Sequence, residues 1–132
     1  QARTEPVNTL ELVERDSPAF GDMVYLEREL DRMAGLEGSE RSVLIPHTAT
    51  NRDGSGGLEL AASHVGREGL LFHGDLFRIV SVARGSGRVR IANFEQSLEP
   101  HDHFGIPAEM PAELIPTGDA PLVVLDATIH SN

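Results

Sequence analysis

One stretch of the sequence largely decides the fold: Ile79-Val-Ser-Val-Ala-Arg-Gly-Ser-Gly-Arg-Val-Arg-Ile91. The residues before the turn with two glycines are mainly apolar, and Arg88-Val-Arg-Ile91 after it alternates strictly, as β-strands that bury one face do. We expect the turn Arg84–Gly87 to join the two strands as a hairpin.

Further short apolar segments lie on both sides of this stretch, separated by turns rich in Gly, Pro and Asp. The expected strands cover residues 10–13, 42–46, 58–65, 70–83, 88–91, 103–107, 112–115 and 122–129. Short strands at this spacing are typical of an all-β sandwich or barrel. Near the N-terminus, Met23, Leu26, Leu30 and Met33 recur with the period of one helical face, which predicts a helix over residues 19–34.

Length and composition limit the classes of function. The 132 residues fit one domain, in which we expect residues 1–56 to pack on a barrel core of residues 57–132. The formal net charge of −10 argues against binding to nucleic acid or to an anionic membrane surface. Cysteine and lysine are absent, which excludes a thiol nucleophile and a Schiff base. No apolar run of about 18 residues and no signal peptide are visible, which predicts a cytoplasmic protein.

Three pieces of the second half resemble the cupin family of small jelly-roll barrels. Residues 79–89 resemble the strand, Gly-x-Gly turn and strand that end the first cupin motif, and His101-Asp-His-Phe-Gly-Ile-Pro-Ala108 resembles the second motif. Residues 118–126 resemble the hairpin and strand that usually follow. The resemblance covers slightly more than half of the chain and implies an all-β fold, a single cupin-type jelly-roll β-barrel with one N-terminal α-helix.

The resemblance also implies positions for a divalent metal, held in many cupins by a His-x-His pair, a Glu and a later His. Counting back from the Gly-x-Gly turn, the Glu position falls on Arg78, the His pair on Leu71 and His73, and the later His on Ala112. At most one of these four positions, His73, carries a residue that can bind a metal, and the guanidinium of Arg78 would repel a metal ion. We therefore predict no cofactor.

A metal at an atypical site is the alternative. His73, His101 and His103 lie near the strands that line a cupin pocket, and three imidazoles suit a divalent transition metal. His101 is more typical of a turn residue, and the direction of the His103 side chain stays open. The remaining histidines carry no pattern, and we expect them at the surface or in ordinary packing: His47, His64 and His130.

Arg78 is the most informative departure from the cupin motif. It shares strand parity with Val80 and Val82, so the alignment directs its guanidinium into the barrel. A buried arginine needs a partner. Three alternatives follow: a structural salt bridge with Asp75 or Glu109, a contact with the carboxylate or phosphate of a ligand, or a solvent-facing side chain if the register is one residue off.

These residues define a candidate site for a small-molecule ligand. The catalytic candidates are His73, His103 and Asp75, and the substrate-binding candidates are Arg78, Glu109, Val80 and Phe104. Imidazole and carboxyl groups beside an apolar lining suit acid–base chemistry on a small organic acid or a biosynthetic intermediate, by isomerisation, dehydration or cyclisation. The alternatives are a non-catalytic cupin-like ligand-binding or accessory module and a metal-dependent cupin. Because cupins are commonly dimers, the resemblance also implies a homodimer, in which a strand at residues 10–13 can join the partner's sheet.

Overall fold

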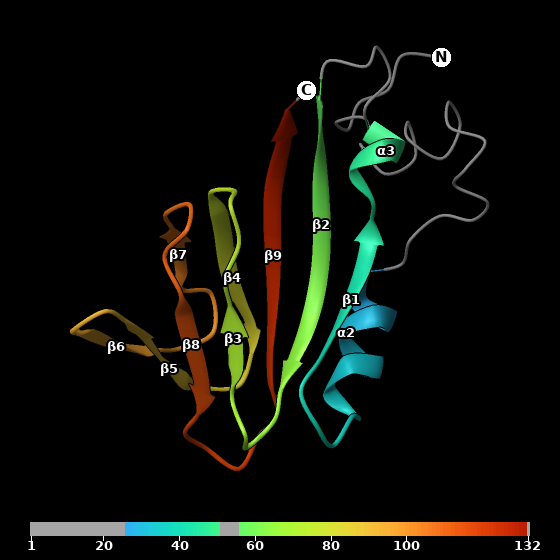
Figure 1. The fold of residues 1–132 in the computed structure, drawn as a ribbon. Coiled ribbons are helices and arrows are strands. Elements are labelled where there is room, and N and C mark those ends of the chain that lie inside the picture. Colours follow the sequence, from blue (N-terminus) through green and yellow to red (C-terminus); the bar gives the residue numbers. More distant parts are fainter. Residues whose placement is uncertain (1–25, 51–55, 132) are drawn as a thin grey trace, which may run out of the picture.

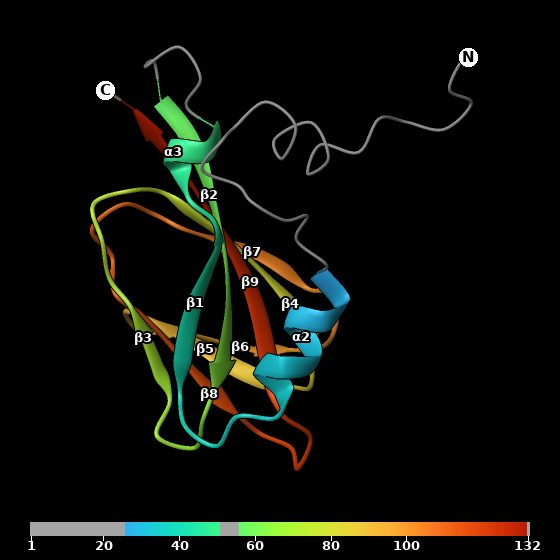
Figure 2. The same cartoon turned by 90° about the vertical axis from the view of Figure 1, so that its right-hand side faces the viewer.

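Two antiparallel β-sheets face each other in the computed structural model, which describes residues 26–50 and 56–131 (Figures 1 and 2). The five-stranded sheet has the order β1-β2-β9-β4-β7, and the four-stranded sheet has the order β3-β8-β5-β6. The strand bounds are β1 Glu40–Ile45, β2 Gly56–Val65, β3 Leu70–Phe72, β4 Arg78–Arg84, β5 Gly87–Ile91, β6 Phe94–Leu98, β7 His103–Ile106, β8 Ala112–Pro116 and β9 Leu122–Ser131. This arrangement confirms the prediction of an all-β jelly roll.

The main hydrophobic core lies between the two sheets. Every strand from β2 to β9 contributes at least one buried apolar side chain to it. Because side chains alternate across a strand, these core residues define the inner face of the five-stranded sheet. Its apolar members are Val65 on β2, Val80 and Val82 on β4, Ile106 on β7, and Leu122 and Val124 on β9.

Helix α2 (Leu26–Ala34) covers part of the outer face of the same sheet (Figure 2). Its buried side chains Leu30 and Met33 belong to a second apolar cluster on this outer face. The periodicity that predicts a helix over residues 19–34 is confirmed for residues 26–34, and the rest of that range lies outside the described residues. A four-residue helix, α3 (His47–Thr50), follows β1. Among the described residues, neither helix has the length and apolarity that a membrane crossing requires.

Two expectations about strand connections are wrong. The segment 70–83 forms two strands in different sheets, β3 and β4, and the turn at Gly85 does not close a hairpin. Instead, β4 pairs with β7 and β9, while β5 pairs with β6 and β8. Alternation along the chain shows that a segment is a strand but does not identify its partner, so the crossing between sheets has no local signature.

Strand β6 is not among the strands expected from the sequence, and four of its five residues are exposed. The strand expected at residues 10–13, which was to join a partner's sheet, lies outside the described residues.

Candidate functional site

The inner face of the five-stranded sheet carries charged side chains at one end of the barrel. Arg78, at the start of β4, is directed inward as its strand parity predicts, and its side chain is only 16% exposed. The guanidinium carbon lies 4.7 Å from the centre of the Phe72 ring on the opposite sheet. Burial lowers the pKa of Arg78, and the nearby carboxylate of Asp126 opposes that effect.

Asp126 on β9 is the carboxylate that Arg78 approaches, and it is already held by a second arginine. Its side chain is 0% exposed. Arg41 on β1 donates two hydrogen bonds to it, from Nε to Oδ2 at 3.1 Å and from Nη2 to Oδ1 at 2.8 Å. Arg78 reaches only Oδ1, with its Nη1 at 3.4 Å. The bond to Asp126 raises the pKa of Arg41, despite partial burial.

This arrangement corrects the predicted partners of Arg78. The expected salt bridge with Asp75 or Glu109 is wrong, because both residues lie exposed in loops while Asp126 is buried on the neighbouring strand β9. The solvent-facing alternative is wrong as well, since the register holds. Among the described residues, the weak contact with Asp126 is the only ion pair of Arg78.

A second carboxylate extends the charged row toward β1. Glu59 on β2 accepts a hydrogen bond from Arg41 Nη2 to its Oε2 at 3.1 Å. Its Oε1 lies 4.0 Å from His47 Nδ1 and 4.0 Å from His130 Nε2. The two imidazole rings are stacked, with centroids 4.1 Å apart and planes inclined by 5°.

No pattern in the sequence predicts this grouping. His47 and His130 are expected separately, at the surface or in ordinary packing, and the structure brings them together through α3 and the pairing of β2 with β9. Their separation along the chain leaves no local pattern that could have revealed the pair. His64, by contrast, makes an ordinary packing contact, with its Nδ1 2.8 Å from the carbonyl oxygen of Gly38.

The metal positions implied by the cupin resemblance do not fit a metal ion. Leu71 and His73 are both exposed, and Phe72 between them is the residue that faces inward. Phe72 pairs with Ala112, which offers no ligand atom, and its ring lies against the Arg78 guanidinium. Leu71 offers no ligand atom either, and His73 lies in the loop that follows β3, so no pair of imidazoles faces inward at this position. A cation–π contact occupies the place where those ligands were expected.

Three of the predicted site residues lie in loops next to Arg78. His73 and Asp75 flank Gly74, where an added Cβ would lie 3.7 Å from Arg78 Nη2. The backbone nitrogen of Glu109 donates to the carbonyl oxygen of Gly74 at 2.7 Å, so the two loops are joined at this point. The structure thus gathers these exposed residues around one end of the barrel, close to the guanidinium.

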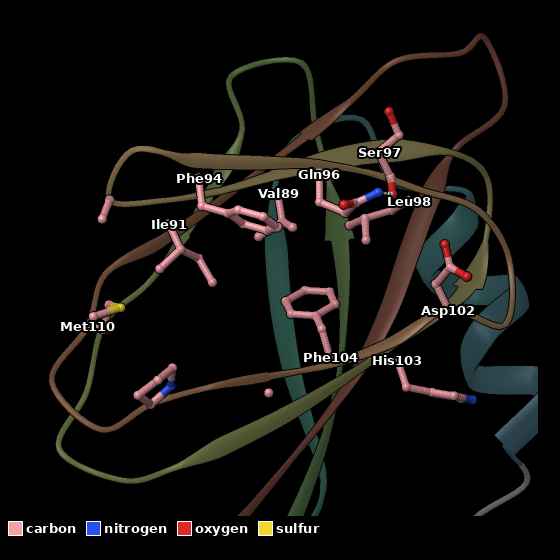
Figure 3. A pocket seen from close by; sticks show the side chains of 13 residues that line it. Val89, Ile91, Phe94, Gln96, Ser97, Leu98, Asp102, His103, Phe104 and Met110 are labelled. Carbon is pink, nitrogen blue, oxygen red and sulfur yellow. Dashed lines mark hydrogen bonds between the residues drawn. The ribbon is translucent and has the colours of Figure 1, made fainter.

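The other predicted histidines lie elsewhere. His103 Nδ1 is hydrogen-bonded to Ser81 Oγ at 2.8 Å, and Ser81 alternates with the inward-facing valines of β4. Figure 3 shows the His103 ring directed away from Phe104. His101 is exposed in a turn with a φ of 78°. Among the described residues, His73, His101 and His103 do not form a group that could hold a metal ion.

An apolar cavity of about 660 Å³ opens between β5, β6 and β7 (Figure 3). Phe104 faces Val89 and Phe94 across it, and Gln96 provides a polar group. Its volume is within the range of sites for small ligands. Of the predicted substrate-binding residues, Phe104 lines this cavity, whereas Val80 is fully buried beside it in the sheet and Arg78 is not part of the lining.

Comparison with known proteins identifies the fold. No protein-family model matches the sequence, and no curated protein matches it. A structure from Bacillus halodurans shares 19% identity and a TM-score of 0.62, over 85% of this chain and 83% of that chain. An RmlC-like cupin from Shewanella frigidimarina shares 14% identity and a TM-score of 0.55, over 74% and 81%. A cupin 2 domain-containing protein from Halorhodospira halophila shares 21% identity and a TM-score of 0.55, over 74% and 70%.

The chain therefore belongs to the class of β-barrel proteins built from two antiparallel sheets, here with a row of charged side chains on the inner face of one sheet. More specifically, the chain shares the jelly-roll fold of these cupin structures, the fold that its resemblance to cupin motifs implied. At these levels of identity the similarity describes the fold, so the function has to be argued from the site.

Proposed function

We propose that this chain is a cupin-type small-molecule enzyme that binds the carboxylate of a small organic acid through Arg78. The observation that carries the proposal is the unequal sharing of Asp126: Arg41 holds both of its oxygens, while Arg78 has one contact at 3.4 Å. A planar guanidinium binds a carboxylate best through two parallel N–H···O bonds. A ligand carboxylate would supply the close ion pair that Asp126 does not give Arg78.

The acid–base groups of this proposal come from the loops beside Arg78. His73 would exchange a proton with the bound acid, because imidazole changes its charge near neutral pH. Asp75 and Glu109 would orient that imidazole or accept the proton. The position of the Gly74 backbone supports this assignment, since a Cβ added there would lie in ordinary contact with the Arg78 guanidinium, at 3.7 Å from Nη2. His103 has no part in it, because its ring is bonded on the outer face.

Structural neighbours are compatible with chemistry on small molecules. They include a protein described as a putative mannose-6-phosphate isomerase from Ralstonia eutropha, at 17% identity and a TM-score of 0.53, over 75% of this chain and 89% of that chain. One fold hosts many activities, so this neighbour is compatible with isomerase chemistry and identifies neither the reaction nor the substrate of this chain. Isomerisation, dehydration or cyclisation of an organic acid fits a site with a cation and an exposed imidazole.

A thermal-shift screen with small mono- and dicarboxylates tests the proposal. A ligand at 100 times its Kd stabilises the native state by about 2.7 kcal/mol, a shift in Tm of several degrees. We expect carboxylates to raise the Tm of the parent and of the His101→Ala control, and to leave Arg78→Met unchanged. Turnover of a bound acid should then fall in His73→Ala while binding persists. Equal shifts in the parent and in Arg78→Met would contradict the assignment.

A non-catalytic ligand-binding module is the second candidate, and the apolar cavity favours it. The lining is mainly apolar, and the carboxylate of Asp102 already accepts a hydrogen bond from the backbone nitrogen of Glu99 at 2.7 Å. A ligand seated there would be largely apolar and need no carboxylate. Its binding should be insensitive to Arg78→Met and weakened by Phe94→Ala, a change at a side chain that is exposed.

The homodimer implied by the resemblance is also a proposal. Large apolar side chains are exposed on the outer face of the five-stranded sheet beyond α2, and these are Phe77, Ile79 and Ile129. A second copy would cover them. Sedimentation equilibrium of the parent and of Ile129→Arg tests this, because a dimer through this face should dissociate in the variant.

A further inference from the structure

Two histidines and a glutamate converge at one end of the five-stranded sheet. At this end β2 begins, β9 ends and α3 lies beside them (Figures 1 and 2). His47 is the first residue of α3, Glu59 lies on β2 and His130 lies on β9. One ligand atom from each residue lies within 4.8 Å of the other two. None of the three belongs to the metal positions that the cupin resemblance implied.

The carboxylate of this group is oriented by its neighbours. Arg41 donates to Glu59 Oε2 at 3.1 Å, so Oε1 is the oxygen that faces both imidazoles, at 4.0 Å from each. Residues that fix the orientation of a ligand in this way are a regular part of metal sites. Arg41 also uses two bonds on Asp126, so its charge is shared by two carboxylates.

The donor set has the composition of a transition-metal site. Two imidazoles and one carboxylate hold Zn²⁺ in several catalytic sites and hold Fe²⁺ in others, in each case with coordination positions left open. Arg78, the other cation of this end, lies on β4, and β9 separates β4 from β2, so the two backbones are about 10 Å apart by the strand spacing. Its guanidinium is directed to Asp126 on β9, whose carboxylate partly offsets its charge toward an ion at Glu59.

We propose that His47, Glu59 and His130 bind one divalent transition-metal ion, of which Zn²⁺ is the first candidate. The ion requires a local movement, because the lone pair of an imidazole lies in the ring plane and the two rings are stacked. His47 lies on a short helix and has 37% of its side chain exposed, against 26% for His130, so the proposal assigns the movement to the His47 ring. His130 Nε2 also gives up its 3.1 Å contact with Thr128 Oγ1. The donor atoms then approach to about 2.0–2.2 Å from the ion.

Cobalt titration of the tag-free protein tests this site without any organic ligand. We expect one Co²⁺ per chain, with visible d–d absorption, and displacement of the cobalt by Zn²⁺. His130→Ala and Glu59→Gln should weaken binding at least 100-fold, and His101→Ala, at an exposed turn, should bind as the parent does. Circular dichroism and urea midpoints establish that each variant is folded. Two variants are used so that, if one of them does not fold, the other still tests the site.

Two results would overturn the proposal. One is the absence of stoichiometric binding at 1 mM Co²⁺, a concentration chosen to reveal a Kd of about 0.1 mM. The other is binding that survives in His130→Ala and Glu59→Gln. Neither result bears on the increase in Tm that carboxylates should produce through Arg78. The failure of this site and the failure of the proposed function are therefore distinguishable.

Discussion

The same substitution should have a large effect on stability at one of the two inward-facing arginines and a small effect at the other. In Arg41→Met, Asp126 loses bonds of 2.8 and 3.1 Å, and Glu59 loses one of 3.1 Å. Asp126 then keeps only the 3.4 Å contact with Arg78. Breaking a buried pair costs about 3–5 kcal/mol. Because the Arg41 side chain is 28% exposed, we expect a loss of about 2–4 kcal/mol in the free energy of unfolding.

Arg78→Met should change the stability little. It removes one long contact with Asp126 and a cation–π contact with Phe72, which is worth about 0.5–1 kcal/mol. It also removes a guanidinium whose pKa is lowered by burial, and therefore a charge that is poorly solvated. Since an apolar side chain of similar volume is often neutral or stabilising in such a place, we expect a change within about 1 kcal/mol.

Urea unfolding followed by circular dichroism measures both variants. With a slope of about 1–3 kcal/mol per molar urea, Arg41→Met should lower the midpoint by about 1–2 M, and Arg78→Met should leave it nearly unchanged. Arg88→Met, at an exposed arginine of β5, is the matched control for the loss of one surface charge. Equal losses in both variants, or a larger loss in Arg78→Met, would refute the assignment of Arg41 as structural and Arg78 as available to a ligand.

Three further predictions follow from single contacts. Asp126→Asn leaves two guanidinium groups without their buried counter-charge, so it should cost at least as much stability as Arg41→Met, and added sulfate should restore part of the loss in a urea titration. Gly85→Ala should cost about 2–4 kcal/mol by the same assay, because Gly85 has a φ of 78° and an added Cβ would clash with the carbonyl group of Pro121; an unchanged midpoint would contradict this turn geometry. The backbone nitrogen of Ser39 donates to Glu68 Oε2 at 2.7 Å and lowers the pKa of Glu68. A lowered folded pKa means that this stabilisation is present above the ordinary pKa and is lost as the pH falls through the folded value. Glu68→Gln should therefore lower the Tm at pH 7, and the difference from the parent should shrink as the pH falls below the ordinary pKa of a glutamate; a difference that does not depend on pH would count against the contact.

The fold was largely accessible from the sequence because its signals are local. The apolar run before the turn at Gly85, the alternation in residues 88–91 and the helical period around Leu30 and Met33 indicate strands and a helix, and these elements were confirmed. The pairing of strands was not accessible in this way. The turn at Gly85 joins two strands that belong to different sheets, and only the long-range pairing of β4 with β9 decides that.

The candidate site was accessible only in part, for the same reason. The inward direction of Arg78 follows from its parity with Val80 and was confirmed, but its partner Asp126 lies 48 residues further along the chain. Before the structure, nothing linked His47 to His130, since their contact depends on the position of α3 against β2 and β9. Asp75 is an expected partner because it is close to Arg78 in sequence, and Glu109 because the cupin resemblance places it near the same pocket. Neither consideration points to Asp126.

A crystal structure of the protein grown with a small dicarboxylate such as malonate tests the central claim most directly. We predict one carboxylate of the ligand within hydrogen-bond distance of the Arg78 guanidinium inside the barrel, with both oxygens of Asp126 still bonded to Arg41. A guanidinium of Arg78 that is paired through two close bonds with Asp126, with the dicarboxylate bound elsewhere or not at all, would contradict it.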